Sequence, residues 1–406
     1  MAEPTQPPFL PYGRQVIEDD DVAAVAEALR ADMLTTGPRV EAFEAAFAET
    51  VGARYAVACS NGTAALHLSL MALDLQPGDV VIAPAVTFAA TANCARYQGG
   101  EAVFADVDTD TGLMTPKTLA AAIGRLNGRR LAAVLPVHLA GHVVDLPALK
   151  GLAAEHGAPM VEDACHALGT TMAFDNQPER VGDVRHSAMA CFSFHPVKTI
   201  ATGEGGMVTT NDPALAERLR LFRSHGISRD PASFQRPELA FDLDGEVNPW
   251  VYEMQALGYN YRLPDILCAL GLSQLAKLDR FVARRRALTA RYRALIEPLA
   301  PLVRCVASPR ACDPALHLFV VLIDFAAAGM SRRRVMEALR ARGIGSQVHY
   351  IPVHHQPYYQ ARYGRIDLPG ADAYYERCLS LPLFPSMADA DPDRVVEAIR
   401  EVLGIG

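Results

Sequence analysis

The sequence predicts an α/β fold, with a large and mainly parallel sheet covered by helices and a smaller α+β domain after it. Short apolar runs alternate with segments of helical period, and such alternation requires crossover connections between parallel strands. The expected strands are residues 55–59, 80–83, 102–106, 132–137, 160–163, 188–194 and 207–210. The expected helices between them include residues 63–73, 87–97, 146–156 and 213–223.

The pattern changes after Pro264, where we place a domain boundary. Residues 1–264 are expected to form an N-terminal arm and the large domain, and residues 265–406 a long linking helix and the small domain. The second part is expected to contain helices at 265–295, 331–342 and 391–403, and strands at 316–324 and 347–351. Residues 228–252 are interpreted as a long loop, which in a compact enzyme is usually functional.

The composition is that of a globular enzyme rather than a nucleic-acid-binding or membrane protein. Half of the 406 residues are hydrophobic, and the net charge is −8 without a long basic block. No apolar stretch approaches the roughly 18 residues that a membrane span needs, and the first residues lack the pattern of a signal peptide. The 8 cysteines are scattered without metal-binding spacing. We therefore expect a cytoplasmic protein with free thiols.

One lysine and one aspartate indicate the chemistry. Lys198 lies between an apolar run and a glycine cluster, and Asp163 ends an expected strand. An aldehyde cofactor needs an amine to hold it, and a pyridine ring accepts electrons well only if a carboxylate keeps its nitrogen protonated. Taken singly, Lys198 could be a solvated residue and Asp163 a helix cap. Together they predict that pyridoxal 5'-phosphate is held as a Schiff base.

A third segment predicts a phosphate site. Residues 59–70 are expected to form the end of a strand, a turn and a helix, with Ser60, Gly62 and Thr63 in the turn. Backbone N–H groups at a helix N-terminus, together with hydroxyl groups, bind phosphate. The same residues could also be an ordinary N-cap. In an open parallel sheet, this turn, Asp163 and Lys198 all lie beyond the carboxyl ends of the strands.

These three segments, in this order, resemble the DegT/DnrJ/EryC1/StrS family of sugar-nucleotide aminotransferases. The resemblance covers nearly the whole chain and includes residues 34–38, 136–141, 258–262 and 381–385. It implies an aspartate-aminotransferase-like architecture, that of fold type I pyridoxal phosphate enzymes. Within the family, residues 193–198 and 349–360 are most similar to the transaminases of pseudaminic acid biosynthesis, which produce UDP-4-amino-4,6-dideoxy-N-acetyl-β-L-altrosamine.

The resemblance implies a role for each residue around the cofactor ring. Lys198 would hold the cofactor and then carry the proton between the substrate carbon and the cofactor carbon. Asp163 would pair with the ring nitrogen, and Phe88 would stack on the ring. His166 stands where many relatives carry Gln, near the phenolic oxygen, although it could also be a histidine that only satisfies a helix start. His142 also replaces a Gln that is usual in relatives.

The resemblance also implies shared sites in a homodimer. Gly62, Thr63 and Ser193 would bind the cofactor phosphate. Asn260 and Arg262 match a Gly-x-Asn-x-Arg motif that reaches the phosphate site from the neighbouring subunit in the family. A monomer would then lack a complete site.

Several histidines are expected to line the sugar-nucleotide pocket. These are His195, close to Lys198 in the chain, and the group His349, His354 and His355. A metal site is another interpretation of this group, but no Asp, Glu or Cys accompanies it at ligand spacing along the chain. We therefore expect no metal.

The resemblance implies transamination in two half-reactions. The amino donor is expected to be L-glutamate. The acceptor is expected to be a nucleotide-linked 4-keto-6-deoxy sugar, UDP-2-acetamido-2,6-dideoxy-β-L-arabino-hex-4-ulose, aminated at carbon 4. GDP-perosamine-type and UDP-arabinose-type substrates remain alternatives. The dehydratase branch of the family carries histidine in place of the lysine, so Lys198 disfavours it. A regulatory protein that binds the cofactor without turnover usually carries a DNA-binding domain, and none precedes residue 14.

Overall fold

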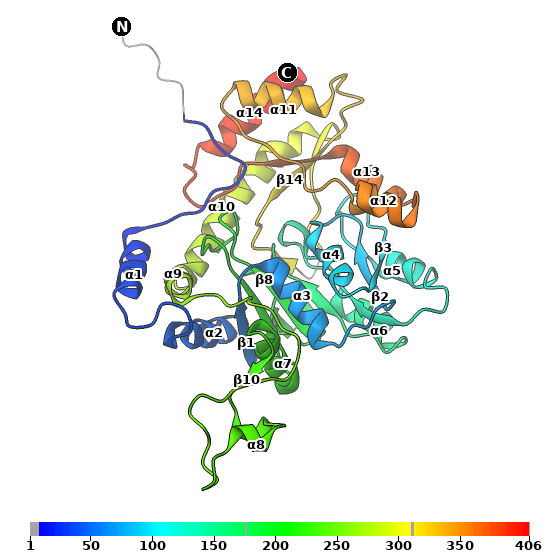
Figure 1. The fold of residues 1–406 in the computed structure, drawn as a ribbon. Coiled ribbons are helices and arrows are strands. Elements are labelled where there is room, and N and C mark those ends of the chain that lie inside the picture. The colour runs from blue at the N-terminus through cyan, green and yellow to red at the C-terminus, as the bar shows by residue number, and fades with distance from the viewer. Residues whose placement is uncertain (1–7, 175–176, 310–311, 406) are drawn as a thin grey trace.

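A computed structural model describes residues 8–174, 177–309 and 312–405 (Figure 1). Residues 1–7 of the expected N-terminal arm lie outside the described residues. The strands are β1 Tyr55–Cys59, β2 Val80–Pro84, β3 Glu101–Ala105, β4 Leu131–Val134, β5 Val161–Asp163, β6 Thr171–Phe174, β7 Gln177–Arg180, β8 Met189–Ser193, β9 Gly206–Thr210, β10 Ile227–Ser228, β11 Glu253–Met254, β12 Val303–Cys305, β13 Cys312–Asp313, β14 Phe319–Ile323 and β15 Cys378–Leu381.

The helices alternate with these strands, as the sequence pattern predicts. The α-helices are α1 Asp19–Leu29, α2 Pro38–Val51, α3 Gly62–Ala72, α4 Ala90–Tyr97, α5 Pro116–Ile123, α6 Leu146–Ala154, α7 Pro213–Arg223, α8 Pro237–Ala240, α9 Asp265–Leu275, α10 Leu278–Ile296, α11 Arg332–Ala341, α12 Pro357–Tyr363, α13 Pro369–Arg377 and α14 Asp391–Leu403. The short 3₁₀ turns are η1 Leu139–Gly141, η2 Pro231–Ser233, η3 Glu297–Leu299 and η4 Val353–His355.

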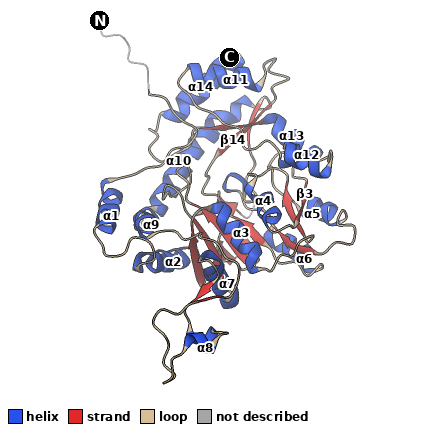
Figure 2. Cartoon of the chain, in the orientation of Figure 1, coloured by secondary structure: helices blue, strands red, loops and turns tan. Residues whose placement is uncertain are grey.

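A mixed, mainly parallel sheet forms the centre of the larger part (Figure 2). Its strands lie in the order β3, β2, β4, β5, β8, β9, β1, where the parallel bridges Val134 to Met160 and Val137 to Asp163 join the β4 and β5 segments. β9 runs antiparallel to both of its neighbours, and the other pairs are parallel. The structure thus confirms the α/β fold class.

Alternate residues of the strands enter two separate cores. In β1, Ala56 and Ala58 belong to the core that includes α2, whereas Val57 and Cys59 belong to the core that includes α3. Successive side chains of a strand point to opposite faces, so a sheet covered on both faces needs apolar residues at nearly every position. The near-continuous apolar strands of the sequence follow from this arrangement.

The C-terminal part builds a second sheet in the order β12, β14, β15. Its core contains Val321 and Ile323 of β14, which pack with Val395 and Ile399 of α14. The helix α10 runs diagonally from the large sheet towards this second sheet (Figure 1). Strand pairing also crosses the expected boundary, because β13 pairs with β6 of the larger part. The division at residues 264 and 265 stays a prediction.

Two expected elements were wrong. The helix expected at 265–295 is two helices, α9 and α10, separated at Ala276 and Lys277, where the amine of Lys277 binds Asp20 and Asp21 of α1. The strand expected at 347–351 does not form. Only Gln347 bridges to a strand, at Ser380, and the chain then leaves the sheet towards the cavity described below.

The segment expected as a long loop extends away from the body of the protein. It holds η2 and α8, and β10 and β11 pair at its base (Figure 1). Several of its large apolar side chains are exposed, including Leu243 and Trp250. Exposed apolar groups gathered on one projecting segment are typical of an interaction surface.

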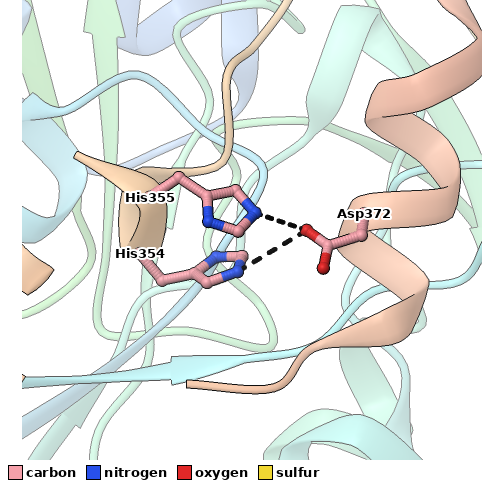
Figure 3. Close-up of side chains that lie close together, drawn as sticks. All are labelled: His354, His355 and Asp372. Carbon is pink, nitrogen blue, oxygen red and sulfur yellow. Dashed lines mark hydrogen bonds and ion pairs between the residues drawn. The ribbon is translucent and has the colours of Figure 1, made fainter. Parts of the chain in front are cut away.

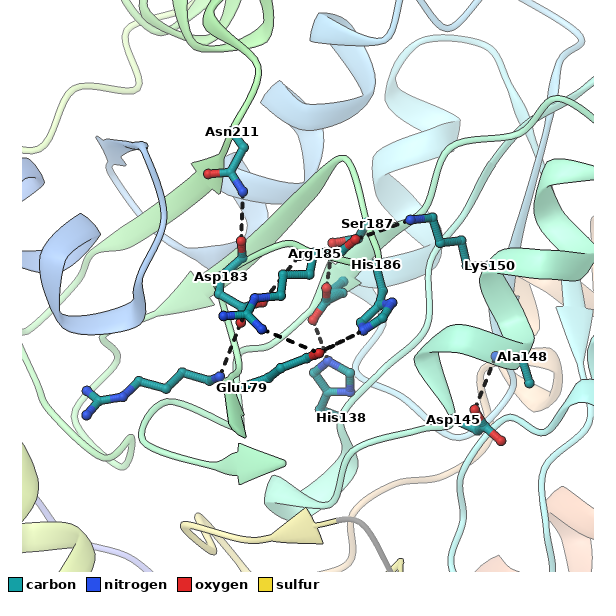
Figure 4. Close-up of polar contacts among 12 residues, drawn as sticks. His138, Asp145, Ala148, Lys150, Glu179, Asp183, Arg185, His186, Ser187 and Asn211 are labelled. Carbon is teal, nitrogen blue, oxygen red and sulfur yellow. Dashed lines mark hydrogen bonds and ion pairs between the residues drawn. The ribbon is translucent and has the colours of Figure 1, made fainter. Parts of the chain in front are cut away.

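A buried polar cluster lies behind β5. The carboxylate of Glu162 accepts a hydrogen bond from the Ser187 hydroxyl at 2.5 Å and lies 2.8 Å from Nε2 of His138. Figure 4 shows His138 and Ser187 in this cluster, next to the pair of Glu179 and His186. Because neighbouring residues of a strand face opposite sides, Glu162 anchors one face of β5 while Asp163 is free to face the other.

Candidate active site

A cavity of about 490 Å³ opens at the carboxyl ends of β5 and β8. Most of the residues singled out from the sequence lie in its wall. These are Gly62, Thr63, Phe88, Asp163, His166, Ser193, His195, Lys198 and His349. They come from five separate stretches of the chain, which the sheet topology brings to one edge.

Lys198 presents a reactive amine to this cavity. Its backbone N–H donates to the carbonyl of His195, which closes a tight turn after β8. Although Lys198 is only partly buried by surface area, the protein around its amine lowers the pKa by desolvation, and the nearby Cys165 and Asp163 oppose this shift. Among the described residues, the amine has no partner in an ion pair or hydrogen bond. An unpaired amine of lowered pKa is a suitable nucleophile and proton carrier.

Asp163 is held in place as a carboxylate. The Thr91 hydroxyl donates to its Oδ2 at 2.7 Å, and the backbone N–H of Cys165 donates to its Oδ1 at 3.2 Å. Asp163 is buried and lies at the end of β5. Donors to both oxygens fix the orientation of the carboxyl group at the end of β5.

The first turn of α3 forms the part of the wall that lies next to Ser193, at the end of β8. The side chain of Asn61 accepts from the N–H of Ala64, and the first backbone bond of the helix runs from Ala65 to Asn61. The N–H groups of Gly62 and Thr63 precede that bond, which makes this turn suitable for a phosphate. A Cβ at Gly62 would lie 2.9 Å from Cβ of Ser193, so only glycine allows this approach.

 Phe88 follows β2 and lies in the cavity wall, where it is 58% exposed. Its ring lies 6.0 Å from that of Tyr350, measured between centroids. An aromatic face left open at a cavity suits stacking against a planar ring.

His166 and Tyr350 form a hydrogen-bonded pair in the wall. The N–H of Ala140 donates to Nδ1 of His166 at 3.3 Å, so Nδ1 accepts and Nε2 carries the proton. Nε2 lies 3.1 Å from the Tyr350 hydroxyl, which therefore accepts from it and keeps its own proton to donate. Burial lowers the pKa of His166 well below its usual value and raises that of Tyr350. Both side chains are therefore neutral near neutral pH.

His317 is a further wall residue that the sequence analysis missed. Its ring lies 4.6 Å from that of His166, and its Nδ1 is buried without a hydrogen-bond partner among the described residues. Burial lowers the pKa of His317 well below its usual value.

Four of the expected site residues lie outside this cavity wall. Asn260 and Arg262 are not in the cavity wall of their own chain, and the backbone of Asn260 bridges to Ser224. His354 and His355 are also absent from this wall, and their contact with the sugar nucleotide stays a prediction. The side chain of His354 is buried on η4 and faces Asp372 of α13.

Three further residues of the site were not predicted from the sequence, and only one of them gave a local sequence signal. Asn61 stands directly before Gly62 and is a favoured N-cap residue, so its role could have been found in the sequence. Thr91 and Tyr350 gave no such signal, because each acts through a partner that is far away in the chain.

The family model described as the DegT/DnrJ/EryC1/StrS aminotransferase family matches residues 15–400. The chain belongs to this family. Its members are pyridoxal-phosphate-dependent sugar aminotransferases, so this DegT-family chain is an enzyme of that class.

Known proteins similar to this DegT-family chain agree with the assignment. The spore coat polysaccharide biosynthesis protein SpsC of Bacillus subtilis (strain 168) is 39% identical over 401 residues, with 97% of each chain covered. PseC of Helicobacter pylori, an aminotransferase of pseudoaminic acid biosynthesis, superposes with a TM-score of 0.85 at 28% identity, covering 98% of this chain and 99% of that chain.

The pyridoxal phosphate form of the putative sugar aminotransferase Spr1654 from Streptococcus pneumoniae gives a TM-score of 0.84 at 25% identity, with 98% and 99% coverage. The cavity residues of this DegT-family chain fit the same cofactor. An unpaired amine, a doubly hydrogen-bonded carboxylate and an open aromatic face surround one cavity, next to a helix N-terminus. Within the described residues, no helix has the length and apolar character needed to cross a membrane.

Proposed function

We propose that this enzyme transfers the amino group of L-glutamate to carbon 4 of a nucleotide-linked 4-keto-6-deoxy sugar. The observation that carries the proposal is the meeting of Lys198, Asp163 and the first turn of α3 at one cavity. The amine, the carboxylate and the anion site are the three groups that pyridoxal phosphate chemistry requires. When bound, the cofactor supplies an electron sink for the substrate carbon that loses or gains the amino group.

The protein contributes binding and proton transfer around that group. Gly62, Thr63 and Ser193 would bind the phosphate, and Phe88 would orient the ring. Asp163 would hold a proton at the ring nitrogen by its negative charge. The amine of Lys198, which burial makes easier to deprotonate, would take a proton from the substrate carbon and return it at the other reacting carbon.

We further propose that His166 and Tyr350 orient the phenolic edge of the cofactor. His166 is neutral and donates through Nε2, while the Tyr350 hydroxyl retains a donor for the cavity. The pair thus offers a hydrogen bond without a buried positive charge. His195 and His349 lie in the same wall and would contact the sugar nucleotide.

The proposed sugar is a UDP-linked 2-acetamido-2,6-dideoxy-4-hexulose of the L-arabino configuration, which would feed pseudaminic acid synthesis. The similarity to PseC over nearly the whole chain supports this choice. A second candidate is a GDP-perosamine-type or other nucleotide-linked sugar. The 39% identity to SpsC, a protein of spore coat polysaccharide biosynthesis, favours a sugar other than the pseudaminic acid precursor.

The deciding experiment is a substrate panel. The purified enzyme is incubated with L-glutamate and with UDP- or GDP-linked 4-keto-6-deoxy sugars, and the amino sugar products are followed by mass spectrometry. A site that hydrogen-bonds the acetamido group should reject analogues that lack it by a large factor in kcat/KM. Equal or better rates with the GDP-linked 4-keto-6-deoxymannose would overturn the UDP-linked assignment and leave only the sugar aminotransferase class.

A further inference from the structure

Two histidines and an aspartate gather outside the active-site cavity (Figure 3). His354 and His355 end η4, and Asp372 lies in the first turn of α13. Nε2 of His355 lies 2.5 Å from Oδ1 of Asp372, and Nε2 of His354 lies 3.7 Å from the same oxygen. One donor atom from each of the three residues lies within 4.8 Å of the other two.

His354 is the unusual member of this cluster. Its side chain is 1% exposed, and among the described residues neither Nδ1 nor Nε2 has a hydrogen-bond partner. Other buried histidines of the described chain leave at most one ring nitrogen in that state. Leaving a buried polar group unpaired is costly, so a buried imidazole usually has a partner. The hydrogen bond between His355 and Asp372 explains the position of His355, whereas Nε2 of His354 stays 3.7 Å from the same oxygen, beyond hydrogen-bond distance.

We propose that His354, His355 and Asp372 bind one divalent transition metal ion of the zinc class. Two imidazole nitrogens and one carboxylate oxygen are a common donor set for zinc. Zinc lies about 2.1 Å from such donors, which places tetrahedral neighbours about 3.4 Å apart. The 3.7 Å distance from His354 to Asp372 is close to this value, and His355 needs to withdraw by about 1 Å to admit the ion.

The exposure of the cluster supports a three-ligand site. The side chains of His355 and Asp372 are 35% and 38% exposed, so solvent reaches the cluster on one side. A water molecule can then complete the four ligands. Asp372 comes from a separate helix, so the stretch of chain around the histidines shows no carboxylate at ligand spacing.

The ion would link η4, which follows two residues of the cavity wall in the chain, to α13. The backbone N–H of Val353, which begins η4, donates to the carbonyl of Ala85 at 2.7 Å, and His349 and Tyr350 of the cavity wall precede η4 directly. The cluster residues themselves do not line the cavity. The ion would therefore have a structural role, in which it holds η4 against α13.

The test uses the tag-free enzyme with its organic cofactor, treated with a chelator and then dialysed. Zn²⁺ is titrated in by calorimetry, and bound metal is counted by elemental analysis after gel filtration. The variants are His354→Gln and Asp372→Asn. The matched controls are His156→Gln and Asp389→Asn, since both residues are exposed and neither is near the cluster.

We expect one zinc ion per wild-type chain, and the same in both controls. Each cluster variant should bind zinc at least about tenfold to a hundredfold more weakly. Zinc should also raise the Tm of the wild type and controls but not of the cluster variants. Because Asp372 is partly exposed, Asp372→Asn provides a folded variant even if His354→Gln does not fold. Absence of stoichiometric zinc in the wild type, or unchanged binding in Asp372→Asn, would overturn the proposal.

Discussion

The Thr91 hydroxyl donates a 2.7 Å hydrogen bond to Oδ2 of Asp163, across the space between α4 and the end of β5. The Thr87 hydroxyl lies 2.7 Å from that of Thr91. Because a carboxylate can only accept, Thr91 must donate to Asp163, and Thr87 must donate to Thr91. The two threonines thus form a buried chain of donors that ends on the carboxylate.

This chain predicts that Thr91→Val lowers activity without changing the fold. A hydrogen bond to a charged group is worth about 1.5–3 kcal/mol, so the loss should reduce kcat by about tenfold to a hundredfold. Steady-state kinetics with L-glutamate and an accepted keto sugar measure the effect. Thr289→Val is the matched control, because the Thr289 hydroxyl is buried without a hydrogen-bond partner among the described residues. A wild-type kcat in Thr91→Val would show that this hydrogen bond does not support the reaction.

The pKa of Lys198 predicts a pH-dependent stability difference in the cofactor-free protein. Burial lowers this pKa below the value of 10.5 that the amine keeps in the unfolded chain. Between the two values the unfolded state binds more protons, so the stability contributed by the neutral amine is present above the unfolded pKa and is lost as the pH falls through the folded pKa.

Lys198→Met removes this titration, and we predict that it raises the Tm more at about pH 7 than at about pH 9.5. Differential scanning calorimetry of the cofactor-free wild type and variant measures both values. The exposed Lys150→Met serves as the control and should shift the Tm equally at the two pH values. A shift for Lys198→Met that grows with pH would contradict the lowered pKa.

The shared active site that the family resemblance implies predicts complementation between two inactive variants. Lys198→Ala lacks the amine, and an Asn260→Ala/Arg262→Ala chain lacks the groups proposed to complete the partner's phosphate site. The two variants are mixed in equal amounts, unfolded and refolded together, so that about half of the dimers are hybrids. Each hybrid has one intact site out of two, so the mixture should regain about a quarter of wild-type activity. Activity assays and light scattering test this. A fully active monomer, or no recovery in verified hybrids, would reject the shared site.

The buried cluster behind β5 predicts a large stability cost at Glu162. Glu162→Ala leaves the Ser187 hydroxyl and His138 Nε2 without their partner, which should cost about 3 kcal/mol. Urea unfolding followed by fluorescence and circular dichroism measures the loss. Glu155→Ala, at an exposed position, should change stability by less than about 0.5 kcal/mol. Equal midpoints for the two variants would show that the cluster contributes nothing.

The sequence predicted the parts of the fold that depend on local pattern. The strands near residues 55–59 and 207–210 and the helices α7 and α14 follow directly from runs and periods of apolar residues. The same local pattern failed where the tertiary structure interrupts it. Lys277 binds α1 at the break between α9 and α10, and residues after Gln347 leave the sheet to form the cavity wall.

The sequence by itself determined the chemical groups of the site. Lys198 beside its glycine cluster, Asp163 at a strand end and the turn before α3 are local features, and parallel topology brings all three to one edge of the sheet. The tertiary structure alone decided which residues support them.

Thr91, His317 and Asp372 meet their partners only because distant elements pack together. Such contacts depend on the direction in which each side chain leaves its helix or strand, and on how closely two backbones approach. A pattern along one stretch of chain contains neither quantity. The donor to Asp163, the inner wall of the cavity and the proposed metal site therefore became visible only in the folded molecule.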